Sequence, residues 1–279
     1  MGSVTHRRSS ADVRPGGTPP ALARSLPTLV AHLHAAVREV RPSRDELDAA
    51  LGFLTEVGQA SDGRRQEWVL LADLLGVSAL VAELDGPGPA GATPAAPRGP
   101  FHRDDVPARE AGADLCLDGR GEPLEVRLRV VDLDGDPIAG AELETWQPNA
   151  DGAFENQRPD EQPEFNLRGR FLTDADGRAR YRSVRPGGYR VPADGPAGRL
   201  LGALGWSLER PAHLHFRLRA AGFETLVTQV YDRDDPHVGR DALHAVRPGL
   251  LGTFAREPDG GDGVPRWSLD FTFVLARRP

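Results

Sequence analysis

The sequence predicts a mainly β protein, in which an antiparallel β-sandwich follows a helical N-terminal domain. Two changes along the chain support this expectation. From Leu26 to about residue 84, apolar residues recur at steps of three and four, which is typical of helices. Beyond Leu115 the period changes to two, and short runs bounded by turn residues follow without interleaved helices. Residues 86–100, rich in proline and glycine, separate the two parts.

The helical part has recognisable starts and ends. Ser43, with Glu46 three residues later, has the form of a capping box and predicts the start of a second helix. A third is expected over 64–75, where Gly76 ends it, and a short fourth follows. Residues 1–24 are expected to be a disordered tail because they hold few apolar side chains. The expected domains are thus 25–100, helical with a linker, and 101–279, the sandwich.

Strands are expected over 126–130, 141–145, 212–219, 225–231 and 267–275. Asp174 to Gly177, between the runs 170–173 and 178–183, predicts a hairpin with an Asp-Gly turn.

Composition excludes several classes of protein. The 279 residues include 34 Lys and Arg against 41 Asp and Glu, so the net charge of −7 argues against a nucleic-acid binder. No stretch approaches the roughly 18 consecutive apolar residues of a membrane-spanning helix. The N-terminus lacks the apolar core of a signal peptide, so we expect a cytoplasmic protein. The single cysteine, Cys116, excludes an intramolecular disulfide and a cysteine-based zinc site.

Residues 210–216 (Arg-Pro-Ala-His-Leu-His-Phe) place His213 and His215 two positions apart in an expected strand. Side chains two apart face the same side, so both imidazoles could bind one metal ion. An ordinary strand with two half-buried histidines is the alternative. Tyr189 lies in a turn-rich run, 185–198, and could be a phenolate ligand or a buried aromatic residue.

Longer runs agree with a known family. They are residues 33–42, 53–59, 65–67, 71–78, 165–169, 173–177, 188–192, 210–216 and 228–231. In these runs the sequence resembles the intradiol ring-cleavage dioxygenases, and most closely their hydroxyquinol and catechol 1,2-dioxygenase branch. The resemblance extends over about residues 26–275.

The resemblance implies a function and its partners. A non-haem Fe(III), held by two tyrosines and two histidines in the sandwich, would use O2 to cleave an aromatic diol such as a catechol or hydroxyquinol. Cleavage between the two hydroxylated carbons gives a muconate-type diacid. The helical domain would form a homodimer, with a phospholipid in an apolar tunnel.

The family's site residues fall on matching positions of this chain. The metal ligands would be Tyr189, His213 and His215. The catalytic residues would be Arg210 and Gln229, and His244, which stands where the family usually has phenylalanine, is added as a candidate. Residues that line the substrate would be Leu70, Asp73, Arg98, Gly99, Pro100, Phe154 and Ala245.

One position departs from the family. Phe154 stands where the second tyrosine ligand is expected, after Trp146 and Asn149. Phenylalanine can neither bind a metal nor take a proton, so a ligand and a base are missing. We hypothesise that His244 or Arg98, also unusual at their positions, compensates for the missing tyrosine or recognises an acidic or larger substrate. The alternatives to standard ring cleavage are a metalloenzyme with a changed reaction and a non-catalytic catechol-binding relative.

Overall fold

The computed structural model describes residues 20–62, 66–85, 88–258 and 263–278, in two units that divide between Thr55 and Glu56. The first unit contains α1 (Pro20–Val40) and most of α2 (Arg44–Gln59). The capping box of α2 is confirmed: the Ser43 amide donates to Glu46 Oε2 at 2.7 Å, and the Glu46 amide donates to Ser43 Oγ at 3.2 Å. Because α1 begins at Pro20, residues 20–24 are helical instead of belonging to the expected tail. Residues 1–19 of that tail lie outside the described residues.

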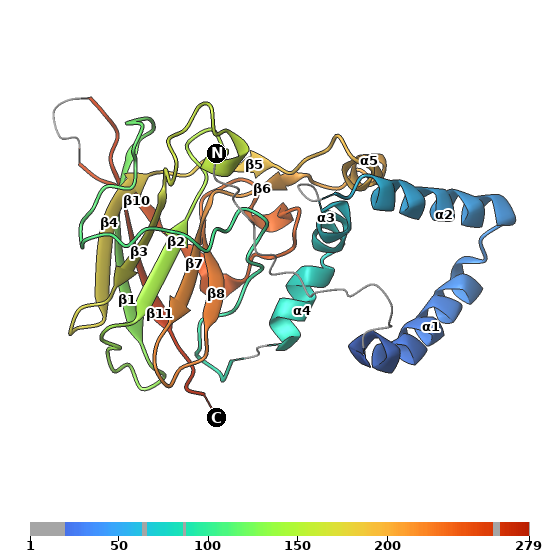
Figure 1. Cartoon of the computed structure of the whole chain (residues 1–279), viewed down its shortest axis with the longest axis horizontal. Coiled ribbons are helices and arrows are strands. Elements are labelled where there is room, and N and C mark those ends of the chain that lie inside the picture. The colour runs from blue at the N-terminus through green and yellow to red at the C-terminus, as the bar shows by residue number, and fades with distance from the viewer. Residues whose placement is uncertain (1–19, 63–65, 86–87, 259–262, 279) are drawn as a thin grey trace, which may run out of the picture. The chain divides into compact units, whose positions relative to one another are not determined.

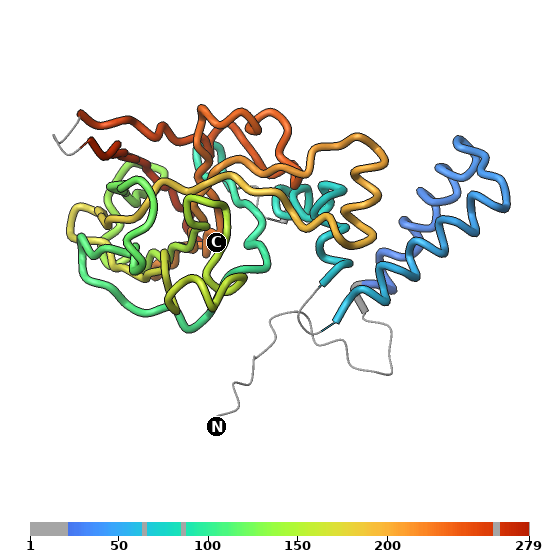
Figure 2. Tube along the Cα trace, turned by 90° about the horizontal axis from the view of Figure 1, so that it is seen from above, coloured from blue at the N-terminus to red at the C-terminus, as the bar shows by residue number. Residues whose placement is uncertain are grey.

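Three helices belong to the second unit, α3 (Glu67–Leu74), α4 (Val77–Asp85) and α5 (Pro196–Ala203). Gly76 lies between α3 and α4 with φ of +71°, a conformation that glycine adopts without strain. The structure adds α5, which the sequence did not predict. Its Pro196 occupies the first helical turn, where a missing amide costs no hydrogen bond. Both views show α5 beside α3 (Figure 1, Figure 2).

The strands form two main sheets and a short ribbon (Figure 1). One sheet has the order β10 (Phe254–Arg256), β11 (Trp267–Val274), β1 (Pro123–Val131) and β4 (Arg178–Val184). The other has the order β3 (Arg168–Leu172), β2 (Glu142–Trp146), β7 (His213–Arg219), β8 (Leu226–Asp232) and β9 (Leu251–Gly252). The ribbon pairs β5 (Tyr189–Arg190) with β6 (Glu209–Arg210), and short 3-10 helices cover Glu155–Gln157, Val238–Arg240 and Pro248–Leu250.

The hydrophobic core lies between the two main sheets, which confirms the expected fold class. In β1, Leu124, Val126, Leu128 and Val130 are buried and alternate with exposed or half-buried neighbours. Phe216 of β7 contacts Phe273 of β11 with 4.9 Å between the ring centroids, so side chains from both sheets meet in one core.

Two expectations about strand pairing need correction. The sandwich is not wholly antiparallel, because β1 pairs with β11 in parallel over eight residue pairs. The hairpin expected over 170–183 is wrong: the Asp174–Gly177 turn forms, but β3 pairs with β2 whereas β4 pairs with β1. The turn therefore carries the chain from β3 in one sheet to β4 in the other.

The proline-rich segment is an extended wrap over the sandwich. The Thr93 amide donates to the carbonyl of Val274 at 3.0 Å, and the Ala96 amide to that of Val227 at 2.9 Å. This path brings Pro97 to Gln229 of β8 and Gly99 to His215 of β7. Among the described residues, no helix is long and apolar enough to cross a membrane.

Candidate active site

The two histidines of β7 converge on one point, as their spacing predicts. His213 and His215 are 0% and 1% exposed, and their Nε2 atoms lie 3.1 Å apart. Two nitrogens that each lie about 2.0–2.1 Å from a metal ion can span this gap. The alternative of two half-buried histidines in an ordinary strand does not match this buried convergence.

The histidines are neutral and His213 is oriented for metal binding. Its Nδ1 lies 2.7 Å from the carbonyl of Pro211, which must accept the Nδ1 proton, so Nε2 carries a free lone pair. Burial, helped by the charge of Arg210, lowers the pKa of His213 to about 3. Burial and the neighbouring His213 hold the pKa of His215 well below its ordinary value.

Tyr189 joins this pair through the β5–β6 ribbon. Its backbone pairs with that of Arg210, which lies three residues before His213. Arg210 Nη1 lies 3.3 Å from the Tyr189 hydroxyl and 3.2 Å from His213 Nε2. One guanidinium nitrogen thus touches two of the three expected ligands. Burial raises the pKa of the Tyr189 phenol, and the charge of Arg210 opposes that rise.

Arg210 is buried, and each nitrogen of its guanidinium group has a hydrogen-bond partner. Its Nε donates to Asp241 Oδ1 at 3.0 Å, and its Nη2 donates to Gln229 Oε1 at 2.9 Å and to the Tyr231 hydroxyl at 3.0 Å. Burial acts to raise the pKa of Asp241, but the charge of Arg210 and hydrogen bonds from Arg210 and the Ala245 amide together lower that pKa below its ordinary value. The sequence predicted Arg210 and Gln229, but neither Asp241 nor the contact of Tyr231 with this group.

Phe154 forms an aromatic wall beside the ligands. It is fully buried, stacks on Phe101 with 4.5 Å between centroids, and lies 5.9 Å from both Tyr189 and His215. Gly152 makes this approach possible: a Cβ there would lie 2.7 Å from the Cβ of Tyr189. The structure therefore places a ring without donor atoms next to two of the three expected ligands, Tyr189 and His215.

Other predicted substrate residues approach this group to different degrees. Gly99 lies against His215, since a Cβ at Gly99 would be 3.4 Å from the imidazole Cε1. Asp73 of α3 is buried. Burial raises its pKa, and the charge of Arg210 opposes that rise. Leu70, Arg98 and Pro100 make no hydrogen bond, ion pair or ring contact with the ligands in the described part of the chain.

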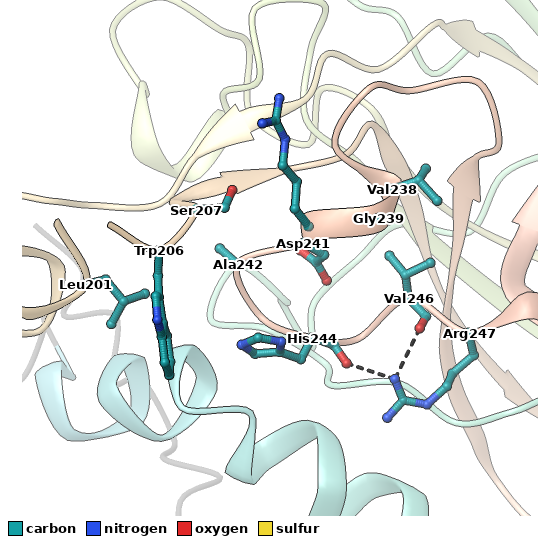
Figure 3. A pocket seen from close by; sticks show the side chains of 11 residues that line it. Leu201, Trp206, Ser207, Val238, Gly239, Asp241, Ala242, His244, Val246 and Arg247 are labelled. Carbon is teal, nitrogen blue, oxygen red and sulfur yellow. Dashed lines mark hydrogen bonds between the residues drawn. The ribbon is translucent and has the colours of Figure 1, made fainter. Parts of the chain in front are cut away.

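His244 lies in a separate pocket of about 560 Å³ (Figure 3). Its ring meets Trp206 edge-on with 6.2 Å between centroids, and its carbonyl accepts a bond from Arg247 at 2.8 Å. Asp241 links this pocket to Arg210, and Oδ2 of Asp241 accepts the amide of Ala245 at 3.0 Å. Among described residues, no hydrogen bond or ring contact joins His244 to the expected ligands.

The donor set fits a non-haem iron ion. Two neutral imidazoles and one phenol oxygen resemble the three-ligand facial sites of non-haem iron proteins. His213 is already in the tautomer that leaves Nε2 free to bind a metal.

Comparison with known proteins decides the family. The family model described as "Dioxygenase" matches residues 97–277, and that described as "Catechol dioxygenase N terminus" matches residues 22–93. The chain belongs to the intradiol ring-cleavage dioxygenases. It is therefore an oxidoreductase of a family that uses non-haem iron, and the alternatives to ring cleavage are not favoured.

Named relatives are similar in sequence to this dioxygenase over about nine-tenths of their length. Hydroxyquinol 1,2-dioxygenase of Rhizobium sp. is 44% identical over 265 residues, which covers 92% of this chain and 90% of that protein. 6-Chlorohydroxyquinol 1,2-dioxygenase of Cupriavidus pinatubonensis is 42% identical, with 92% of each chain covered. The crystal structure of hydroxyquinol 1,2-dioxygenase from Pseudomonas putida superposes with a TM-score of 0.88 at 36% identity and covers 94% of both chains.

Proposed function

We propose that this dioxygenase binds one Fe(III) through Tyr189, His213 and His215, and that it cleaves hydroxyquinol or a related catechol. Cleavage by O2 between the two hydroxylated carbons would give a muconate-type diacid. The observation that carries the proposal is the grouping of the buried His213 and His215 Nε2 atoms, 3.1 Å apart, with Tyr189 around Arg210. The hydroxyquinol relatives support the substrate class.

Arg210 would stabilise negative charge on the ring. Bound iron supplies the Lewis acidity and redox capacity that ring cleavage requires. Arg210 adds a positive charge that is fixed in advance, because Asp241, Gln229 and Tyr231 hold the guanidinium in a dry site. Preorganised charge in such a site is a large catalytic term. Gln229 is fixed in turn, since its Nε2 donates to the carbonyl of Pro97 at 2.6 Å.

Phe154 would limit the site to three protein ligands. Its apolar ring lies 5.9 Å from that of His215 and would supply no base for the second hydroxyl proton of the substrate. His244 and Arg98 stay predictions for that role. Leu70, Gly99, Pro100 and Ala245 are proposed to line the substrate with Phe154.

Asp73 offers the buried site an additional polar contact. Its carboxyl is close enough for the charges of Arg210 and Tyr189 to interact with it. We propose that it accepts a hydrogen bond from a further hydroxyl of the substrate, which a hydroxyquinol has and a catechol lacks.

A second copy of the chain and a phospholipid are also proposed as partners, both bound at the N-terminal helices. Leu26, Leu33 and Val40 of α1 are 48%, 63% and 73% exposed, which supports a homodimer formed through these helices and an apolar site for a phospholipid. The cytoplasmic location stays a prediction.

Metal analysis with oxygen-uptake assays tests the function. We expect one iron per chain, and uptake with hydroxyquinol that exceeds uptake with catechol. His213→Ala and His215→Ala should lose iron, whereas His34→Ala, at an exposed position of α1, should keep it. Protein that takes up no iron and stays inert with both diols after iron loading would overturn the proposal.

A further inference from the structure

We propose that Trp146 is a positioning residue for His215, and that it fixes the imidazole by stacking where a hydrogen bond is missing. This inference rests on the proposed iron site. A metal-binding histidine usually donates its second ring N–H to an acceptor that sets the direction of the ring. His213 has such an acceptor in the carbonyl of Pro211, at 2.7 Å. His215 Nδ1 is buried and has no hydrogen-bond partner in the part of the chain that the structure describes.

Trp146 supplies the missing constraint through its flat face. It is the cross-strand partner of His215, on β2, and is fully buried. The two rings stack with 4.9 Å between centroids and 12° between planes. Gly99 closes in at the imidazole Cε1, where a Cβ would come within 3.4 Å. Because its face is covered and its edge is confined, the imidazole of His215 keeps Nε2 directed at His213.

Trp146 is itself held in place by a buried charged group. His102 meets the indole edge-on with 4.8 Å between centroids. His102 Nε2 lies 2.6 Å from Glu144 Oε1, and Glu144 Oε2 accepts a bond from Arg217 at 2.5 Å. Glu144 of β2 is the cross-strand partner of Arg217 of β7. This pair lies two residues along each strand from Trp146 and His215, and so on the same face of the sheet. A continuous chain of contacts therefore runs from Arg217 to the metal ligand.

The test compares iron release from wild-type holoenzyme with release from Trp146→Leu and Trp146→Phe. Excess EDTA is added, and the loss of the phenolate-to-iron absorption band is followed. Phenylalanine keeps a flat aromatic face, although it is smaller than indole, and the indole N–H that it removes has no acceptor among the described residues. Phe171→Leu is the matched control, because Phe171 stacks on Tyr181 at 5.2 Å and 13° in the core and makes no ring contact with Trp146 or the expected ligands in the described part of the chain.

We expect Trp146→Leu to release iron about 10- to 100-fold faster, as loss of an outer partner of a metal ligand does. Trp146→Phe should stay close to the wild-type rate and keep its band position. Phe171→Leu should lower the melting temperature without changing iron release. If Trp146→Leu does not fold, His102→Asn should show a smaller acceleration in the same direction.

Equal release rates in wild type, Trp146→Leu and His102→Asn would overturn the proposal, as would equal acceleration in Phe171→Leu. If wild-type protein holds iron and the variants release it at the same rate, the positioning role alone is wrong. Wild-type protein that binds no iron would overturn the proposed function together with this role.

Discussion

The ring of Phe154 stands edge-on to that of Tyr189, with 5.9 Å between their centroids and 85° between their planes. A phenol at position 154 would share one side of the site with the Tyr189 phenol. The chain instead presents a buried ring without a donor atom, so its proposed iron centre depends on a single tyrosine.

Phe154→Tyr should restore a second phenolate ligand. The iron-loaded variant is expected to absorb more strongly than wild type in the visible region and at a shifted wavelength, because two phenolates donate charge to the metal. Absorption spectra at matched iron content measure this. Phe154→Leu, which adds no phenol, should keep the wild-type band shape, and a Phe154→Tyr spectrum identical to wild type would contradict the assignment.

Arg210→Met should destabilise the fold strongly. It leaves Asp241 as a buried carboxylate without its partner, which costs about 3–5 kcal/mol. Urea unfolding measures the loss, and a second substitution, Asp241→Leu, should recover part of it. Arg199→Met is the control, because the Arg199–Glu56 pair is exposed and should contribute little. If Arg210→Met loses as little unfolding free energy as the control, the buried Arg210–Asp241 pair does not stabilise the fold as expected.

Asp73 should make stability depend on pH. Burial raises its pKa above the ordinary value of 3.8, so the folded protein favours the protonated carboxyl. The stability this gives is fully present below the unfolded pKa and is lost as the pH rises through the folded pKa. Relative to Asp73→Asn, which cannot ionise, wild-type protein should therefore lose stability as the pH rises from about 4.

Urea unfolding over a pH series measures this difference in stability. Asp270→Asn is the control, for which the difference should change with pH in the opposite direction. A hydrogen bond from Arg127 lowers the pKa of Asp270, so its contribution is present above the unfolded pKa and is lost as the pH falls. A pH-independent difference between wild type and Asp73→Asn would show that Asp73 is not perturbed in the folded state.

His244→Ala tests the proposed replacement for the missing base. If His244 transfers a proton of the substrate, turnover should fall by about 100-fold or more while the iron content stays the same. Steady-state kinetics with iron analysis separates these effects. Unchanged turnover would assign His244 to the wall of the pocket beside Trp206, and Arg98→Ala would then be the next variant to examine.

The histidine pair could be predicted because it depends on local geometry alone. In a strand, residues two apart share a face, and β7 places His213 and His215 as that rule requires. Tyr189 was different: turn residues surround it, and only the resemblance to a known family distinguished a ligand from a buried aromatic residue.

The supporting contacts could not be predicted because they join distant parts of the chain. Asp241 lies 31 residues from Arg210 in a loop without periodicity, so no local pattern indicates their ion pair. The stack of Trp146 on His215 depends on the register between β2 and β7. The hairpin error at Asp174 has the same origin, since turn residues indicate a reversal of the chain but not which strands pair.

Isotopically labelled O2 tests the central claim most directly. Iron-loaded protein is incubated with hydroxyquinol under labelled gas, and the product is analysed by mass spectrometry. The account predicts one ring-opened diacid that carries both labelled atoms in the carboxyl groups formed at the broken bond. A product with an intact ring, or a diacid without label from O2, would contradict it.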